Sequence, residues 1–219
     1  MSRPVSRPLS RNASRSDSPW IITVPVWLAL GGAMAVPVAV AAGSPWLAGR
    51  GAVYIVAGFA GIVALALLLV QPLLGGGYLP GLHPARARRW HRALGIGIVG
   101  GVLVHVAGLY LTSPQDALDA LLLASPTPFS VYGVVGLWSI LLTALLVALR
   151  PRMRLRPVVW KGVHNGLAVV AVVSCVVHAA MIEGTMGAVS KGVLCALVLA
   201  VTLGVTVHLR IIRPMRRRG

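Results

Sequence analysis

The chain alternates between long apolar runs and short connections rich in turn residues. Six runs are uncharged or nearly so and reach the length of about 20 residues that a helix needs to cross a bilayer. They are Trp20–Ala42, Gly51–Leu74, Ala93–Thr112, Phe129–Leu149, Gly162–Ile182 and Gly192–Leu209. Outer-membrane strands are only about 10 residues long and alternate in polarity. The pattern therefore predicts an all-α integral membrane protein built as a bundle of six transmembrane helices.

Composition agrees with that prediction and excludes other classes. Of the 219 residues, 57% are apolar and only 11% are charged, against about 45–50% and about 25% in soluble domains. Because six spans take up most of these residues, we expect no soluble catalytic domain among them. The net charge of +16 would suggest nucleic acid in a soluble protein. Here the basic residues lie in connections and tails, so we expect contact with the lipid bilayer and no nucleic-acid partner.

Orientation follows from the distribution of lysine and arginine, which favours the cytoplasmic side. If the chain crosses the membrane six times, 18 of the 20 basic residues fall on one side of it. The other side holds Arg50 and Lys191, with Asp116, Asp119 and Glu183. Both termini are therefore expected in the cytoplasm, and the chain in the cell (inner or plasma) membrane as a multi-pass protein.

Three segments are expected along the chain. Residues 1–19 are rich in Ser, Arg and Pro and predict a disordered basic cytoplasmic tail. Residues 20–212 form the helical bundle, and residues 213–219 a second basic tail. The first span resembles a signal peptide with a cleavage site at Ala39–Ala41, but its run is too long for a usual signal, so we expect a retained helix.

Histidines carry the candidate chemistry, because ionisable residues inside membrane spans are rare and functional by default. His91 and His105 lie on the third span, and His164 and His178 lie at the same interval on the fifth. An interval of fourteen positions brings a helix to within about 40° of four full turns and about 21 Å along its axis. Each pair therefore lies on one face of its helix, at two depths.

The third and fifth spans run in the same direction, so packing them side by side sets His91 opposite His164 and His105 opposite His178. Two facing imidazoles at two depths suit bis-histidine ligation of two stacked haems, with each iron bound from both helices. The alternative is interfacial histidines near helix ends, which suits His83 and His208. Glycines along the third span, among them Gly97 and Gly101, allow close approach of a flat ring or simple helix packing.

The same residues resemble a known family. Residues 88–95, which read RRWHRALG before His105, resemble the third span of ferric reductase-like transmembrane domains. Residues 160–165, which read WKGVHN before His178, resemble the fifth. The superfamily includes ferric reductases, NADPH oxidases and the haem-binding membrane subunit of the methionine sulfoxide reductase system. The likeness covers roughly residues 51–182.

The resemblance implies a b-type cytochrome with two haems that carries electrons from the cytoplasm to an unknown acceptor on the outer face. By position, His91 and His164 would bind the inner haem iron, and His105 and His178 the outer one. Such a chain is an oxidoreductase or its membrane subunit. Ferric reductases and NADPH oxidases typically add a flavin and nicotinamide domain, which we do not expect here. The sulfoxide reductase subunit often lacks the inner histidine of the third span, which this chain has.

A separate donor is therefore expected, either a flavoprotein or a membrane quinol, so that flavin or quinone enters through a partner. Two alternatives stay open. One is a quinol-coupled cytochrome b that anchors a peripheral dehydrogenase. The other is a transporter or structural membrane protein without redox chemistry.

Overall fold

The computed structural model describes residues 20–216, and both basic tails, apart from residues 213–216, lie outside that range. Helices account for nearly all regular structure, and no strand occurs within residues 20–216. Six helices are long and apolar enough to cross a membrane. The prediction of an all-α six-span protein is therefore confirmed for the described part of the chain.

The membrane-length helices match the predicted runs with modest extensions. They are α1 (Trp20–Ala42), α2 (Ala52–Gly76), α3 (Pro84–Thr112), α5 (Pro128–Met153), α6 (Pro157–Met181) and α7 (Ala188–Val207). Shorter pieces join or continue them: the 3-10 turn Pro45–Leu47, α4 (Pro114–Leu121), the π-helical turn His208–Ile212 and α8 (Arg213–Met215). The predicted sixth span began at Gly192, whereas α7 begins four residues earlier.

Local sequence explains where several helices start and stop. Proline occupies the first turn of α3, α5 and α6, where its missing N–H costs nothing and its fixed φ suits the helix. α3 starts well before the predicted apolar run because His83 caps it, with Nδ1 accepting from the backbone N–H of Ala85 (3.3 Å). α2 ends at Gly76, and the residue after it, Gly77, adopts the left-handed conformation (φ 71°) that favours glycine.

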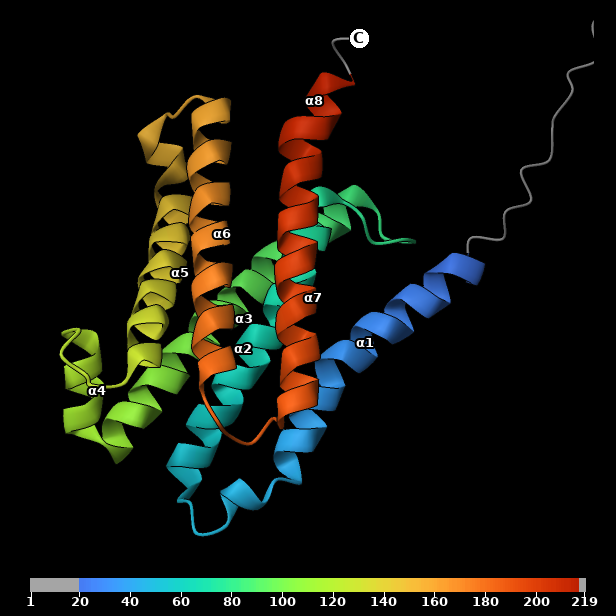
Figure 1. The fold of residues 1–219 in the computed structure, drawn as a ribbon. Helices are drawn as coiled ribbons and strands as arrows, with labels where there is room; N and C mark the ends of the chain where they lie inside the picture. The colour runs from blue at the N-terminus through green and yellow to red at the C-terminus, as the bar shows by residue number, and fades with distance from the viewer. Residues whose placement is uncertain (1–19, 217–219) are drawn as a thin grey trace, which may run out of the picture.

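Successive long helices run in alternate directions, and α5, α6 and α7 stand side by side (Figure 1). The tightest packing joins α2 with α3 and α5 with α6. Among the described helices, α3 and α6 do not pack backbone to backbone along their lengths. The chain thus forms two helix pairs, α2 with α3 and α5 with α6, and α7 packs against α2 and α6.

One end of the bundle, here called the basic end, carries the start of α1, the connections 77–83 and 154–156, and residues 208–216. Twelve of the fourteen described lysines and arginines lie at or near this end, and only Arg50 and Lys191 lie at the opposite end. The segregation that the sequence predicts is therefore present in the fold. The side of the membrane that each end faces stays a prediction.

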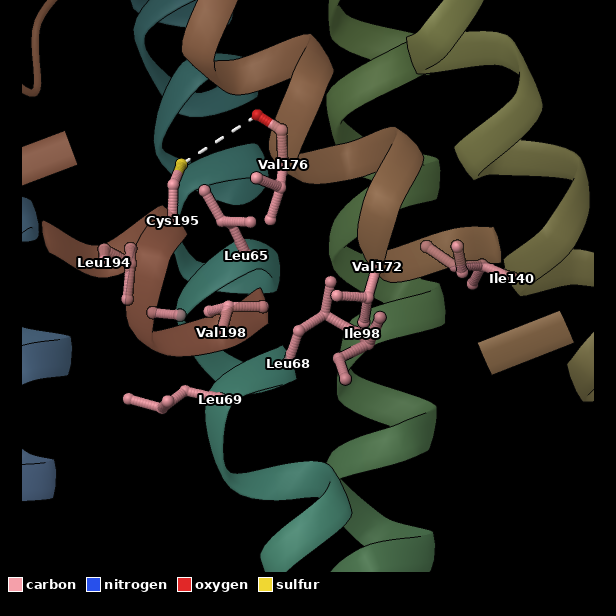
Figure 2. Close-up of a cluster of buried hydrophobic side chains, with 12 residues drawn as sticks. Leu65, Leu68, Leu69, Ile98, Ile140, Val172, Val176, Leu194, Cys195 and Val198 are labelled. Carbon is pink, nitrogen blue, oxygen red and sulfur yellow. Dashed lines mark hydrogen bonds between the residues drawn. The ribbon is translucent and has the colours of Figure 1, made fainter. Parts of the chain in front are cut away.

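The apolar core fills the middle of the bundle. Leu69 and Leu194 are 1% exposed and Val198 is fully buried, which joins α2 to α7. The same cluster continues through Leu65, Leu68, Ile98, Ile140, Val172 and Val176 (Figure 2). Since lipid tails are as apolar as these side chains, close packing rather than exclusion of water stabilises the contacts here. This core fixes α3 and α6 relative to each other.

Candidate functional site

The structure brings the four histidines of α3 and α6 together in two facing pairs. The ring centres of His91 and His164 lie 6.3 Å apart. Those of His105 and His178 lie 6.5 Å apart. In both pairs the ring planes are steeply inclined, at 63° and 80°. The equal interval between the histidines of each helix therefore places matching rings opposite one another at two depths, as the sequence analysis expects.

Hydrogen bonds fix the protonation of both rings in the His105–His178 pair. Nδ1 of His105 lies 2.8 Å from the carbonyl oxygen of Ala57 on α2. Nδ1 of His178 lies 2.8 Å from the carbonyl oxygen of Phe129 on α5. A carbonyl oxygen only accepts, so Nδ1 carries the proton and donates it in each case. In a neutral imidazole this leaves the lone pair of Nε2 free to bind a metal.

His91 is oriented by a reciprocal contact with Gln71 of α2. Its Nδ1–H donates to the carbonyl oxygen of Gln71 (3.1 Å). The side-chain amide of Gln71 donates to the carbonyl oxygen of His91 (3.3 Å). His91 therefore presents Nε2 in the same protonation state as His105 and His178, with one additional hydrogen bond locking α3 to α2.

A glycine stands one turn after each accepting carbonyl. Gly61 follows Ala57 by four residues, Gly75 follows Gln71, and Gly133 follows Phe129. A Cβ on Gly61 would lie 2.9 Å from Nδ1 of His105, and one on Gly133 would lie 2.7 Å from Nδ1 of His178. In a helix the carbonyl of residue i points toward residue i+4, so a missing side chain there exposes the carbonyl. The glycines both make room for the rings and open their acceptors.

His164 breaks this pattern. The position of α5 one histidine interval after Gly133 is occupied by Val147, and Nδ1 of His164 is buried without a hydrogen-bond partner. Its ring is instead stacked on Trp160, with centres 5.1 Å apart and planes 10° apart. The guanidinium of Arg150 covers the ring of Trp160 at 4.1 Å. Stacking thus orients the one histidine that no carbonyl holds, and Nε1 of Trp160 is buried without a partner as well.

Pairs of imidazoles are not a metal site by themselves. Within residues 20–216, no group of three or more His, Cys, Asp or Glu side chains is placed to hold a metal ion. Two opposed imidazoles do suit a metal whose other four ligands come from a macrocycle. Two metal–nitrogen bonds of about 2.0 Å, plus about 1.1 Å from each nitrogen to its ring centre, give about 6.2 Å between centres. Both observed spacings are close to this value.

An apolar layer separates the two pairs. Ile98 lies seven residues from both His91 and His105, and Ala171 lies seven residues from both His164 and His178. Ile98 is 5% exposed and Ala171 is 3% exposed. Both belong to the central cluster, in which Ile98 and Val172 lie close together between α3 and α6 (Figure 2). The two histidine pairs are therefore separate and lie at two levels along α3 and α6.

Comparison with protein families identifies the family of this chain. The family described as ferric reductase like transmembrane component matches residues 58–175, more than half of the chain. The chain belongs to this family. Ferric reductase-like domains commonly bind haem, and membership points to electron transfer across a membrane. Comparisons with curated proteins and with solved structures found no match.

The matched region of this ferric reductase-like chain runs from the early part of α2 into α6. It contains His91, His105 and His164, together with Gly61, Gly75 and Gly133. His178 lies just beyond its end, one turn further along the same helix. The family match therefore covers both helix pairs that build the site, and the structure extends the site to the fourth histidine.

Several features escaped the sequence analysis. The glycines expected to face a flat ring mostly pack against α2: a Cβ on Gly101 would meet Ala60, and one on Gly108 would meet Ala57. These glycines of α3 therefore serve helix packing, the alternative to close approach of a flat ring. The glycines that do cradle the histidines lie on α2 and α5, on helices without any site histidine. His208, predicted to be a simple interfacial residue, contacts Tyr78.

Proposed function

We propose that the chain is a b-type transmembrane electron-transfer protein with two haems. His91 and His164 would hold one haem iron, and His105 and His178 the other. The observation that carries the proposal is the pair of facing imidazoles at each depth, with ring centres 6.3 Å and 6.5 Å apart. Electrons would pass between the two ends of the bundle, from a donor at the basic end to an acceptor at the opposite end.

The residues present are suited to haem in three respects. Nδ1–H donation by His91, His105 and His178 leaves Nε2 as the ligand atom. Gly61 on α2 and Gly133 on α5 leave room for the rings of His105 and His178, which a side chain at either position would displace. At the basic end, Nδ1 of His164 and Nε1 of Trp160 are buried without partners, and buried polar atoms in that state usually serve a bound group or water.

Haem, when bound, would supply one-electron chemistry at an iron whose potential the histidines that hold it and their surroundings would set. The contribution of this chain is to hold and orient the imidazoles and to keep water from the path between them. Hydrogen bonds from Nδ1 make an imidazole a stronger donor to the metal. The apolar layer around Ile98 and Ala171 excludes water and protons from the centre of the bundle, so that electrons alone cross it.

Direction follows from charge. With the basic end in the cytoplasm, the His91–His164 pair lies on the cytoplasmic side and the His105–His178 pair on the outer side. The donor would be a separate flavoprotein or a membrane quinol, and the acceptor a molecule on the outer face. The membrane would be the inner or plasma membrane. A quinol-coupled anchor for a dehydrogenase shares this chemistry, whereas a transporter or structural protein would bind no haem.

Electron transfer across a bilayer tests the proposal directly. Purified haem-loaded protein is placed in vesicles with trapped ferricyanide, and dithionite is added outside under anaerobic conditions. We expect loss of ferricyanide absorbance many times faster than in protein-free vesicles. The His105→Ala chain should be as slow as the empty vesicles, while His83→Asn, which retains the cap of α3, should match the native rate. Equal rates with native protein and with no protein would contradict the proposal.

A further inference from the structure

One contact between titratable side chains lies outside the four-histidine site. Tyr78 follows the end of α2, and His208 follows the end of α7, 130 residues further along the chain. The hydroxyl oxygen of Tyr78 lies 2.5 Å from Nδ1 of His208, and the two ring centres are 5.6 Å apart. A phenol hydrogen-bonded to an imidazole forms a route along which a proton moves, since each group both donates and accepts.

The last two residues of α2 connect this pair to the site. A Cβ on Gly75 would lie 3.4 Å from Cε1 of His91. A Cβ on the next residue, Gly76, would overlap the ring of Tyr78. The rings of His91 and Tyr78 therefore lie against two consecutive residues at the end of α2.

The pair is open to the bilayer. Tyr78 is 37% exposed and His208 is half-buried. Among residues 21–42 of α1, the buried ones are Pro37 and Ala41, both in its second half, whereas residues 21–31 are exposed or half-buried. Figure 1 shows α1 and α7 diverging toward the basic end, where the connection between α2 and α3 lies. Trp27 of α1 joins this connection through a hydrogen bond from Nε1 to the carbonyl oxygen of Pro80 (3.2 Å).

The Tyr78–His208 pair lies near the end of a membrane span. His208 directly follows α7, whose last 16 residues carry no charged side chain, and it precedes Arg210 and Arg213 by two and five positions. Basic residues at the end of a span mark the boundary between hydrocarbon and water. The backbone becomes π-helical from His208 to Ile212, and such turns are frequent at functional sites. The pair thus lies where the head of a lipid-soluble ligand meets water.

We propose that Tyr78 and His208 form a quinol-oxidation site beside the His91–His164 pair. The inference rests on the proposed function and identifies its donor as a lipid-soluble quinol rather than a soluble flavoprotein. A quinol reaches the pair from the bilayer and needs what the pair provides, a proton acceptor next to an electron acceptor.

The protons and electrons of quinol oxidation can be accounted for by Tyr78, His208 and the two proposed haems. Oxidation of one quinol to quinone releases two protons and two electrons. Tyr78 accepts a proton from a quinol hydroxyl as its own hydroxyl proton passes to Nδ1 of His208, and His208 releases a proton from Nε2 to the adjoining water. His208 then returns to its starting form by losing the Nδ1 proton and regaining one at Nε2 through exchange with water, and a second passage along the same route removes the second proton. The two electrons leave singly, so that two ferric haems become ferrous for each quinol.

The test uses haem-loaded full chain in vesicles, with decylubiquinol and menadiol as the quinol probes. The rate of haem reduction is followed anaerobically after each addition. We expect Tyr78→Phe and His208→Gln to slow this rate by at least about tenfold, since positioned proton acceptors contribute about a hundredfold or more. Dithionite should still reduce both variants fully. Tyr110→Phe, which changes an exposed tyrosine on α3, and His83→Asn are matched controls expected to retain the native rate.

A second readout measures binding rather than rate. A photoreactive azidoquinone should label peptides that contain Tyr78 or His208, and unlabelled quinone should suppress the labelling. Native rates in both Tyr78→Phe and His208→Gln, or reduction of native haem by dithionite but by neither quinol, would overturn the inference while leaving the proposed function intact. Protein without any haem would instead overturn the proposed function.

Discussion

Gly61 of α2 lies directly against the imidazole of His105 of α3, where a Cβ would come within 2.9 Å of Nδ1. The same Nδ1–H donates to the carbonyl oxygen of Ala57, one turn earlier on α2. Space for the ring and access to its acceptor have a single cause, the missing side chain. The relationship recurs between Gly133 and His178, so a glycine on a neighbouring helix positions each ring of this pair.

The first prediction concerns that glycine. Gly61→Ala forces the ring of His105 away from its carbonyl acceptor. Loss of such an outer hydrogen bond typically weakens metal binding about 10–100-fold. We expect the variant to lose haem from the His105–His178 pair during dilution while the other haem stays bound, as measured by haem content after gel filtration.

Gly58→Ala is the control for this substitution. It adds the same methyl group to the same helix three residues earlier, where nothing lies within 4 Å. Replacing a helical glycine by alanine there should leave haem binding unchanged and stabilise the helix by about 0.5–1 kcal/mol. Equal haem retention in Gly61→Ala and Gly58→Ala would show that the contact does not position His105.

The second prediction concerns pairing. His91→Ala and His164→Ala should remove the same haem, and His105→Ala and His178→Ala the other, because each iron needs both of its axial ligands. Redox titration of each variant should therefore give two classes of residual spectrum, each shared within a pair. Different residual midpoint potentials for His91→Ala and His164→Ala would show that these two residues do not share an iron.

The third prediction concerns Trp160, which takes the place of a hydrogen bond at His164. Trp160→Leu removes the stacked ring and leaves His164 without an orienting contact. We expect broadening or loss of the low-spin electron paramagnetic resonance signal of the His91–His164 haem, with the second signal unchanged. Trp138→Leu on α5, a tryptophan that is 55% exposed, should alter neither signal, and a change in both signals for Trp160→Leu would contradict the assignment.

The fourth prediction is topological. An enzyme reporter that works only outside the cytoplasm should be active when inserted between Asp116 and Ser125, and inactive when fused after Arg218. The distribution of basic residues requires this orientation. Activity of the C-terminal fusion would reverse the membrane sides assigned to the two histidine pairs and the direction of electron transfer.

The sequence was sufficient for the spans and for the facing histidines, for a physical reason. An interval close to four whole turns of a helix fixes both face and depth, and alternate crossing fixes direction, so the relation of His91 to His164 needed no tertiary information. Apolar runs also located six helices to within a few residues, except at α3. Its polar first turns carry arginines, and only the cap made by His83 reveals them.

The residues that orient the histidines were not accessible in this way. Gly61, Gly75 and Gly133 lie on helices that contribute no ligand, and a glycine in a transmembrane helix more often serves packing. One signal was available: Gly61 and Gly75 are separated by the same interval as the two histidines on α3 and the two on α6. The contact of Tyr78 with His208 joins residues 130 positions apart in the sequence, and no local pattern predicts it.

The number of haems per chain tests the central claim most directly. Purified protein from haem-supplemented cells is converted to the pyridine haemochromogen, and haem is divided by protein from amino-acid analysis. The account predicts two b-type haems per native chain, one in His105→Ala and one in His91→Ala. Native protein that carries no haem, or a single haem that either substitution removes, would contradict the two-site arrangement.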